Sequence, residues 1–448
     1  FNCFVTCHLL LLLIGRSLQV SGGLAAAIYA GNGWAAPSRS PNERLNLAGI
    51  GVGNKGRHNV DQMAGENWVA MCDVDENFLN SACEAHPQAK KFRDYREMFD
   101  KEANNIDAVV VSTADHTHAP ATSVALQLKK HVYCEKPLTH TVAEARAIRD
   151  LAAQAKVATQ MGTQIHAEGN YRRVVELVRG GAIGKVSEVY CWCNKGWSDG
   201  RFQQSAGPAP ATLDWDLWLG PAKSRPYCDN IHPANWRRFW EFGAGTFGDM
   251  ACHVVDLPFW ALELDHPTWV ECEGPEVHPD GAAAWSKATY GFNTKQFGEI
   301  KLHWADGGQN FDFVKQAQDG FGHSLADWGL GILFVGADGM LVADYGQRHL
   351  LPKEKFAEFK APEPTIPDSI GHWNEWLQAC RTGSPTTCNF DYASKLTETV
   401  LLGIVAFRSG KKFEWDAQKL EAKNCPEAQA FISKEYRKGF EVVGLKSV

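Results

Sequence analysis

The residues of this chain best suited to proton transfer include a lysine in the motif Glu135-Lys136-Pro137, which directly follows the apolar run 131–134. A lysine at a strand end can hydrogen-bond a substrate hydroxyl and stabilise the alkoxide that develops during alcohol oxidation. Most lysines at strand ends are only solvated, so the interpretation of Lys136 depends on its surroundings.

A second candidate pair is Asp249 and His253, which follow the glycine-rich stretch 243–248. Their spacing predicts a helix that begins near Asp249 and carries both side chains on one face. A carboxylate there can orient or polarise an imidazole, which is the natural proton acceptor near neutral pH. The alternative is a capping aspartate and a histidine of the core. Asp256, three residues further on, is interpreted as structural.

Three glycines, Gly51, Gly53 and Gly56, follow an apolar run at G-x-G-x-x-G spacing, with Asn54 and Lys55 between them. A phosphate-binding turn needs the first glycine for a tight bend and the second for close approach of a pyrophosphate. The third lets the next helix pack closely on the strand, with its N-terminal N–H groups facing the anion. These five residues are therefore predicted to bind a dinucleotide.

Asp73 ends the apolar run 68–72 and follows Gly51 by 22 positions. At that distance a carboxylate accepts the 2′-hydroxyl of an adenosine ribose and repels a 2′-phosphate, so NAD is favoured over NADP. Asp75 is a rival for this role, and a solvated turn residue is the alternative interpretation.

The polar stretch 113–118 follows the buried run 106–112, at the sheet edge where ligands of such folds bind. Thr113, His116 and His118 are therefore predicted to contact the cofactor, as are Glu135 and Lys136, which lie at the edge where a nicotinamide would bind. Asp115 and the two histidines also resemble metal ligands, but a zinc site needs three or four convergent donors, and no metal is predicted.

These motifs require a framework of alternating strands and helices, which is typical of a parallel sheet covered on both faces. The predicted strands are 45–50, 68–72, 92–95, 106–112, 131–134 and 157–163, and the predicted helices are 57–64, 76–85, 96–103, 120–129 and 141–155. The fold class is α/β, with an N-terminal doubly wound Rossmann domain over 45–164.

Residues 165–448 form a predicted second α/β domain with a large, mostly antiparallel open sheet. Its strands are expected at 186–192, 269–273, 288–292, 299–304, 331–335 and 340–344, with helices at 171–179, 373–381 and 393–408. The segment from about 193 to 240 has little regular pattern, which is common in functional loops. The C-terminal helices can pack back on the first domain.

Composition narrows the class of function. The net charge of −7 argues against a nucleic-acid partner. The 13 cysteines include no C-x-x-C pair and form no disulfide framework, and Cys191 and Cys193 are interpreted as packing residues. The 16 tryptophans favour a sugar substrate, because aromatic faces stack on the C–H faces of sugars.

Residues 1–44 are predicted to lie outside the fold. The run 4–14 is too short to span a bilayer, and Arg16 with the Ala/Gly-rich stretch after it resembles an export signal of the twin-arginine type, although that type has two arginines. Export to the periplasm is therefore one expectation. A disordered extension on a cytoplasmic enzyme is the other.

Together these motifs resemble the Gfo/Idh/MocA oxidoreductases, named for glucose–fructose oxidoreductase and inositol dehydrogenase, over roughly residues 45–410. The resemblance implies hydride transfer between NAD(P) and a sugar or polyol. It also implies that Lys136, Asp249 and His253 flank the reacting carbinol, with His253 as the general base, and that the Lys136–Pro137 bond is cis. By the same resemblance the protein is a homo-oligomer, dimer or tetramer, in which a second subunit covers the open sheet.

The substrate half contains Tyr171, Arg172 and Trp236, which are predicted to contact the substrate together with the three catalytic residues. This half resembles poorly characterised family members with export signals.

Three functions stay open. The first is a sugar or polyol dehydrogenase. The second is a redox-neutral enzyme with tightly bound NAD, either a glycoside hydrolase that works by transient oxidation or a sugar–sugar oxidoreductase. The third is a non-catalytic NAD-binding regulator, which would not need the acid–base set.

Overall fold

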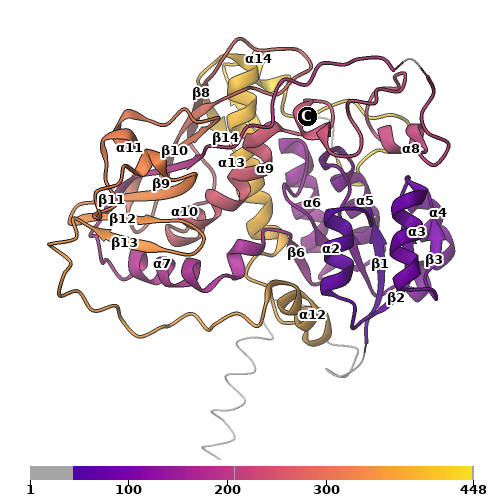
Figure 1. Cartoon of the computed structure of the whole chain (residues 1–448), viewed down its shortest axis with the longest axis horizontal. Helices are drawn as coiled ribbons and strands as arrows, with labels where there is room; N and C mark the ends of the chain where they lie inside the picture. Colours follow the sequence, from indigo (N-terminus) through magenta and orange to yellow (C-terminus); the bar gives the residue numbers. More distant parts are fainter. Residues whose placement is uncertain (1–43, 206, 446–448) are drawn as a thin grey trace, which may run out of the picture.

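The computed structural model describes residues 44–205 and 207–445, which form two sheets with helices packed around them (Figure 1). The predicted export segment lies almost wholly outside these residues and stays a prediction. Within the described part of the chain, no helix is long and apolar enough to cross a membrane.

The first sheet has six parallel strands in the order β3-β2-β1-β4-β5-β6, which confirms the predicted Rossmann domain. Its strands are β1 (Asn46–Ile50), β2 (Asn67–Cys72), β3 (Lys90–Phe92), β4 (Ala108–Val111), β5 (His131–Cys134) and β6 (Thr159–Met161). The helices between them are α2 (Lys55–Gln62), α3 (Glu76–Ala85), α4 (Tyr95–Glu102), α5 (Asp115–Gln127) and α6 (Val142–Ala155), with the short turn η1 (Ala103–Asn105).

Strand β4 shows why this sheet is buried on both faces. All four of its residues are buried, and they alternate between two separate hydrophobic clusters: Val109 and Val111 in one, Ala108 and Val110 in the other. The strand order reverses between β1 and β4, so the crevice at their carboxyl ends is where ligands of such sheets bind.

Helix α5 begins earlier than its sequence predicts. The expected loop 113–118 is wrong, because α5 starts at Asp115 and contains Pro120. Proline has no N–H to donate to the carbonyl four residues earlier, which here belongs to His116. Lys434 from the C-terminal segment donates to that carbonyl instead, with Nζ 3.4 Å from the oxygen. A contact distant in sequence thus offsets the local helix-breaking signal.

The second sheet has nine strands in the order β13-β12-β11-β7-β10-β9-β8-β14-β15, and only the β7–β10 pair is parallel. This confirms the predicted mostly antiparallel sheet. The strands are β7 (Val186–Cys193), β8 (Trp269–Glu273), β9 (Lys287–Thr294), β10 (Gly298–Asp306), β11 (Leu330–Gly336), β12 (Gly339–Ala343), β13 (Arg348–Leu351), β14 (Phe413–Asp416) and β15 (Glu421–Lys423). The last three were not predicted, because they are short, each with at least one exposed residue, and they lie at or next to the edges of the sheet.

One face of this sheet packs against a segment of the same chain. Tyr190 and Trp192 of β7 share a hydrophobic cluster with Val314 and Leu325, which lie in α11 (Asp312–Gln316) and η4 (Leu325–Asp327). A second subunit was predicted to cover this sheet. The homo-oligomer remains a prediction, and this part of the face is covered within the chain.

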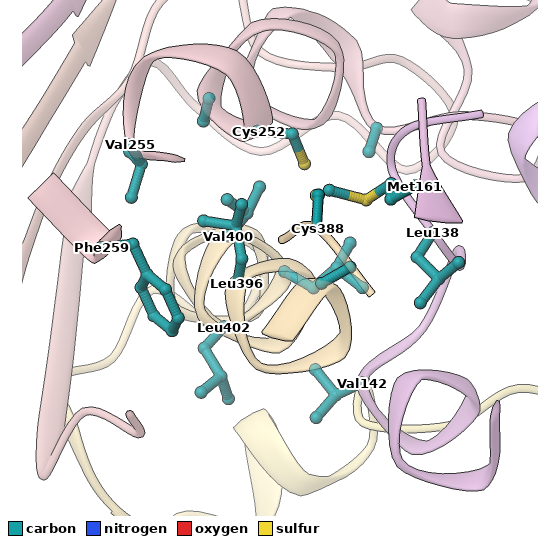
Figure 2. Packing of buried hydrophobic residues seen from close by; sticks show 14 of the residues in the cluster. Leu138, Val142, Met161, Cys252, Val255, Phe259, Cys388, Leu396, Val400 and Leu402 are labelled. Carbon is teal, nitrogen blue, oxygen red and sulfur yellow. The ribbon is translucent and has the colours of Figure 1, made fainter. Parts of the chain in front are cut away.

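Helix α13 (Phe390–Ser409) joins the two domains around a common core (Figure 2). Leu138 and Met161 of the Rossmann domain and Cys252 of α9 (Gly245–Val254) belong to one hydrophobic cluster with Leu396 and Val400 of α13. Each of the first three lies one or two positions from a residue of the candidate site. Burial of their side chains therefore helps to fix the backbone that carries the site.

Other helices complete the second domain: η2 (Gln164–Ala167), α7 (Gly169–Arg179), α8 (Trp215–Leu219), η3 (Asn235–Arg238), α10 (Asp256–Ala261), α12 (His372–Thr382) and α14 (Pro426–Gln429). Trp376 and Leu377 of α12 pack into the Rossmann cluster that contains Leu47 and Val110. The second domain is thus anchored on the first through two long helices, α12 and α13.

Candidate active site

A cavity of about 610 Å³ lies at the carboxyl edge of the first sheet. Its wall combines strand ends of the Rossmann domain with the segment 217–253. The cavity is lined by most of the residues singled out from the sequence: Gly51, Gly53, Asn54, Lys55, Asp73, Thr113, His116, His118, Glu135, Lys136, Trp236 and His253. Four others, namely Gly56, Tyr171, Arg172 and Asp249, do not line it.

The glycine turn has the conformation that its sequence predicts. Gly51 has φ +77°, and a Cβ there would lie 2.8 Å from the backbone of Ser112. A Cβ on Gly56 would lie 1.9 Å from the carbonyl oxygen of Gly51. Gly56 therefore acts through close packing of α2 against the turn, not through contact with the cavity.

Asp73 faces the glycine turn from the end of β2. Its carboxylate accepts hydrogen bonds from the N–H groups of Val52 at 2.8 Å and Gly53 at 3.2 Å, and burial raises its pKa. The rival Asp75 caps α3 and contacts the His232 ring at 3.0 Å, and it does not line the cavity. The geometry therefore favours Asp73 as the acid beside the cofactor.

Lys136 and Asp249 meet across the two domains. The Lys136 Nζ donates to the Asp249 backbone carbonyl at 2.9 Å and, by a shorter contact, to Oδ1 of its carboxylate. The same Oδ1 accepts from Nε of Arg237 at 2.9 Å, and Oδ2 accepts from Nε1 of Trp197 at 2.8 Å. Burial alone would raise the pKa of Asp249, but Lys136 and Arg237 together hold it well below its usual value.

His253 pairs with a threonine that was not identified from the sequence. Its Nδ1 lies 3.0 Å from Oγ1 of Thr163, whose hydroxyl is also 3.3 Å from the Cys252 carbonyl oxygen. A hydroxyl that donates to this carbonyl accepts from Nδ1–H of the ring. This assignment leaves Nε2 without a proton and able to accept one.

The pKa of His253 is lowered to about 3 by burial, with a further contribution from the charge of Lys136 and partial opposition from Asp249. The ring is therefore neutral near pH 7. In the described part of the chain, Nε2 has no hydrogen-bond partner, and His253 lines the cavity. A neutral imidazole in this position is suited to accept a substrate proton.

The expected relation within this pair is only partly correct. The i, i+4 spacing predicted that Asp249 orients or polarises the His253 ring. The charge of Asp249 raises the pKa of the ring, but the carboxylate binds Lys136, Arg237 and Trp197, and the ring contacts Thr163. Helix α9 also begins at Gly245, not near Asp249. Three strong donors compete for the carboxylate more effectively than a neutral ring, so the pair shares a helix without sharing a hydrogen bond.

The two histidines of the predicted cofactor loop are buried and contact backbone. His116 has Nε2 3.1 Å from the Trp218 carbonyl, and His118 lies between the carbonyls of Pro137 and Thr113, at 2.7 and 3.0 Å. His118 thus contacts the loop that carries Lys136, whose bond to Pro137 is cis as predicted. Within the described residues, no group of His, Cys, Asp or Glu is arranged to hold a metal ion.

Glu135 anchors the same loop to the Rossmann domain. Its Oε1 accepts from Asn59 Nδ2 at 2.9 Å, and the Lys55 ammonium is 3.8 Å away. A Cβ on Gly162 would lie 2.7 Å from this carboxylate. Because these contacts hold Glu135 in a crowded pocket, they also fix the position of the next residue, Lys136.

Two residues predicted to bind substrate are structural. The Tyr171 hydroxyl donates to the His253 carbonyl at 3.0 Å, and its side chain is fully buried. Arg172 donates to the Pro367 carbonyl at 2.6 Å and to Glu375 at 2.5 Å. Their position on an amphipathic helix explains the difference, because α7 turns both inward, away from the cavity.

Comparisons with known proteins agree with this architecture. Residues 45–163 match the description "Oxidoreductase family, NAD-binding Rossmann fold", and residues 172–320 match "Oxidoreductase family, C-terminal alpha/beta domain". The chain is similar to myo-inositol 2-dehydrogenase of Thermotoga maritima, with 29% identity over 173 residues, covering 38% of this chain and 48% of the relative. The matched stretch thus spans about half the length of that curated relative.

Two further proteins are similar to this chain, one in sequence and the other in structure. The α-N-acetylgalactosaminidase of Shewanella oneidensis is 29% identical over 160 residues, covering 32% of this chain and 34% of the relative. The solved WlbA dehydrogenase of Bordetella pertussis, in complex with NADH and UDP-GlcNAcA, has a TM-score of 0.58 at 15% identity, covering 84% of this chain and 99% of that one. The structural similarity supports the fold alone.

Proposed function

The chain belongs to the Gfo/Idh/MocA oxidoreductase family, and on this basis we propose that it transfers hydride between NAD and a carbinol carbon of a sugar or polyol. One observation carries the proposal. Lys136, bonded to Asp249, and the neutral His253 ring lie in or beside the wall of the cavity that also contains the glycine turn and Asp73.

The residues of the Rossmann side fit a dinucleotide. The positive φ of Gly51 and the cavity beside Gly53 and Asn54 leave room for a pyrophosphate at the start of α2. Asp73 is placed to accept a ribose hydroxyl, and its charge would repel a 2′-phosphate, which supports NAD over NADP. When bound, the nicotinamide supplies the acceptor for hydride.

Lys136 and His253 supply the acid–base chemistry. Two of the three Lys136 N–H donors bind Asp249, which leaves one to hold a substrate hydroxyl and stabilise its developing negative charge. His253 Nε2 takes the hydroxyl proton as the carbon–oxygen double bond forms. Thr163 keeps the required tautomer, and Asp249 holds Lys136 in place.

The direct test is the nucleotide that the purified protein holds and uses. We expect NAD to bind, and NADH to accumulate at 340 nm with sugars or polyols as substrates. Failure to bind either NAD or NADP, measured by calorimetry on the full chain, would overturn the proposal. Cofactor released by denaturation and identified by mass spectrometry shows whether NAD remains bound through purification.

A second candidate is a redox-neutral glycosidase that keeps NAD bound. The similarity to the α-N-acetylgalactosaminidase is the observation that favours it. In that case NAD remains at one equivalent through purification, and aryl glycosides are cleaved without added cofactor. A protein that is empty of NAD and releases NADH with each turnover excludes this candidate.

A further inference from the structure

Arg237 lines the cavity from η3, and its side chain is 30% exposed. Its Nε donates to Asp249 Oδ1 at 2.9 Å, and its Cζ lies 4.1 Å from the centre of the Trp236 ring. Between residues 44 and 445, position 206 apart, its two terminal amino groups meet no hydrogen-bond acceptor. The guanidinium is therefore held by one hydrogen bond and one stacking contact, while its outer donors stay available.

The charges around Arg237 do not balance. Lys136 and Arg237 share the single carboxylate of Asp249. Asp115 lines the same cavity, but burial raises its pKa to about 7, so it is only partly ionised near neutral pH. The other carboxylates that line the cavity have their own partners: Asp73 accepts from the glycine turn, and Glu135 accepts from Asn59 and faces Lys55. At Arg237 two cationic side chains therefore share one carboxylate, and partly buried positive charge of this kind favours an anionic ligand.

Distances bring this charge close to the reacting centre. Lys136 Nζ and Arg237 Nε bind the same oxygen of Asp249. Two hydrogen bonds of about 3 Å each place these nitrogens no more than about 6 Å apart. The free donors of Lys136 and Arg237 are therefore close enough for one sugar-sized molecule to contact both, with its anionic group on the open side of Arg237.

We propose that the substrate is a sugar acid, whose carboxylate binds the two terminal amino groups of Arg237. This proposal rests on the proposed hydride transfer. A planar pair of donors matches the two oxygens of a carboxylate, whereas a neutral sugar would leave the charge unpaired. Trp236 beneath the guanidinium fixes its plane and adds an aromatic wall near the sugar.

The carboxylate takes no part in the redox step. A ring or chain hydroxyl loses its proton to His253, the C–H hydride passes to NAD⁺, and a carbonyl group forms. The products are the keto acid, NADH and one proton, so the carboxylate acts only as a binding handle. Arg237 is in this sense a specificity residue, and it also supports Asp249.

The test compares matched pairs: D-glucuronate with D-glucose, D-galacturonate with D-galactose, and D-gluconate with D-glucitol. With saturating NAD, the wild-type kcat/KM for the preferred acid should exceed that for its neutral partner by about a hundredfold, as expected for a paired charge. Arg237→Gln should bring the ratio close to one, and Arg237→Lys should give an intermediate value. A disturbance of Asp249 in these variants affects the acid and its neutral partner alike, so it cancels in the ratio of their kcat/KM values.

Arg238→Gln is the matched control, because Arg238 donates to the Ser198 carbonyl at 3.3 Å and does not line the cavity. Its acid-to-neutral ratio should stay at the wild-type value. Calorimetric titration of the NADH-bound protein with the same six compounds measures binding without turnover. It should show tighter binding of the acid in wild type and Arg238→Gln, but not in Arg237→Gln.

Three results would overturn the sugar-acid proposal and leave the proposed hydride transfer intact. Neutral sugars could be used as well as acids, or the acid-to-neutral ratio could be unchanged in Arg237→Gln. A protein that binds NADH could also bind none of the six compounds. A tenfold preference for glucose 6-phosphate over glucuronate would assign the site to phosphate instead. Absence of NAD and NADP binding would instead contradict the proposed function, so the two failures can be told apart.

Discussion

The two walls of the candidate cavity are built in different ways. On the Rossmann side, Gly51, Asp73 and Lys136 each follow a strand of one parallel sheet, so regular backbone places them at a common edge. On the opposite side, Trp236 and Arg237 come from the short helix η3, within the long stretch between β7 and α9, whose described residues include no strand and only short helices. The first wall depends on local geometry, and the second depends on contacts between distant segments.

The carboxylates of Asp73 and Asp249 show how this difference affects function. Asp73 accepts from backbone N–H groups of the turn beside it, whereas Asp249 is held by side chains from three separate segments. A change at Asp73 should therefore alter cofactor binding and leave the chemistry intact. A change in the Asp249 network should alter the chemistry and leave cofactor binding intact.

The largest expected effect tests this division directly. Lys136→Ala removes the donor to substrate and one of the three partners of Asp249. We expect kcat to fall by about 10³-fold or more, because both proton positioning and charge stabilisation are lost. The Kd for NAD, measured by calorimetry, should change less than about threefold, because the glycine turn and Asp73 are untouched.

Lys101→Ala serves as the control, since Lys101 is exposed and pairs with Glu97 on the same helix, away from the cavity. Its kcat should equal that of wild type. Near-wild-type turnover in Lys136→Ala would remove Lys136 from the mechanism. A large loss of NAD affinity would instead show that Lys136 also contributes to cofactor binding.

The next effect concerns the ring of His253. Thr163→Val keeps the volume of the side chain but removes the hydroxyl that contacts Nδ1. The ring then has no partner to select the tautomer with a free Nε2, and we expect kcat to fall by about 10- to 100-fold. Thr163→Ser restores the hydroxyl and should recover most of the activity. Equal rates in the valine and serine variants would contradict this role.

Sequence reasoning succeeds on the first wall because its signals are local. The bend at Gly51, the position of Asp73 after β2 and the Lys136 motif after β5 each depend on a short stretch of chain whose strand period can be recognised. Five strands of the first sheet were predicted close to their observed positions, whereas β3 lies at 90–92 and not at the predicted 92–95, where Asp94 caps α4. The early start of α5 was missed, because Lys434 satisfies the carbonyl that Pro120 leaves free.

The same reasoning fails for the residues that hold Asp249 and His253, and the reason is physical. Thr163, Trp197 and Arg237 form no motif, and each gains its role only when a segment distant in sequence packs against it. The spacing of Asp249 and His253 correctly indicated a shared helix. It could not reveal that stronger donors, brought in by other segments, would bind the carboxylate first.

A smaller effect is expected at Asp73. Asp73→Asn removes the charge that repels a 2′-phosphate but keeps a side-chain oxygen for the turn N–H groups. The Kd ratio of NADP to NAD should fall by about tenfold, with kcat at saturating NAD unchanged. Asp75→Asn should leave the ratio unchanged, because Asp75 caps α3 and lies off the cavity. The reverse pattern would move the ribose contact to Asp75.

The smallest effect is expected in the pH profiles of kcat and KM. These profiles compare two titratable residues that line the cavity, His253 and Asp115. The pKa of His253 is about 3, so its proton-accepting form is present throughout pH 5 to 8 and is lost only as the pH falls through about 3. We therefore expect kcat for oxidation to show no step near 6.5, the ordinary histidine pKa.

Asp115, with a pKa of about 7, should instead affect KM. As the pH rises through 7 it gains a negative charge near Arg237 and Lys136, which weakens the attraction for an anionic substrate. The KM for a sugar acid should rise by roughly threefold, at the low end of a single-charge effect, and Asp115→Asn should abolish the rise. Measurement of kcat and KM from pH 5 to 8.5 separates the two groups. A step in kcat near 6.5 that persists in His232→Gln would contradict the low pKa of His253.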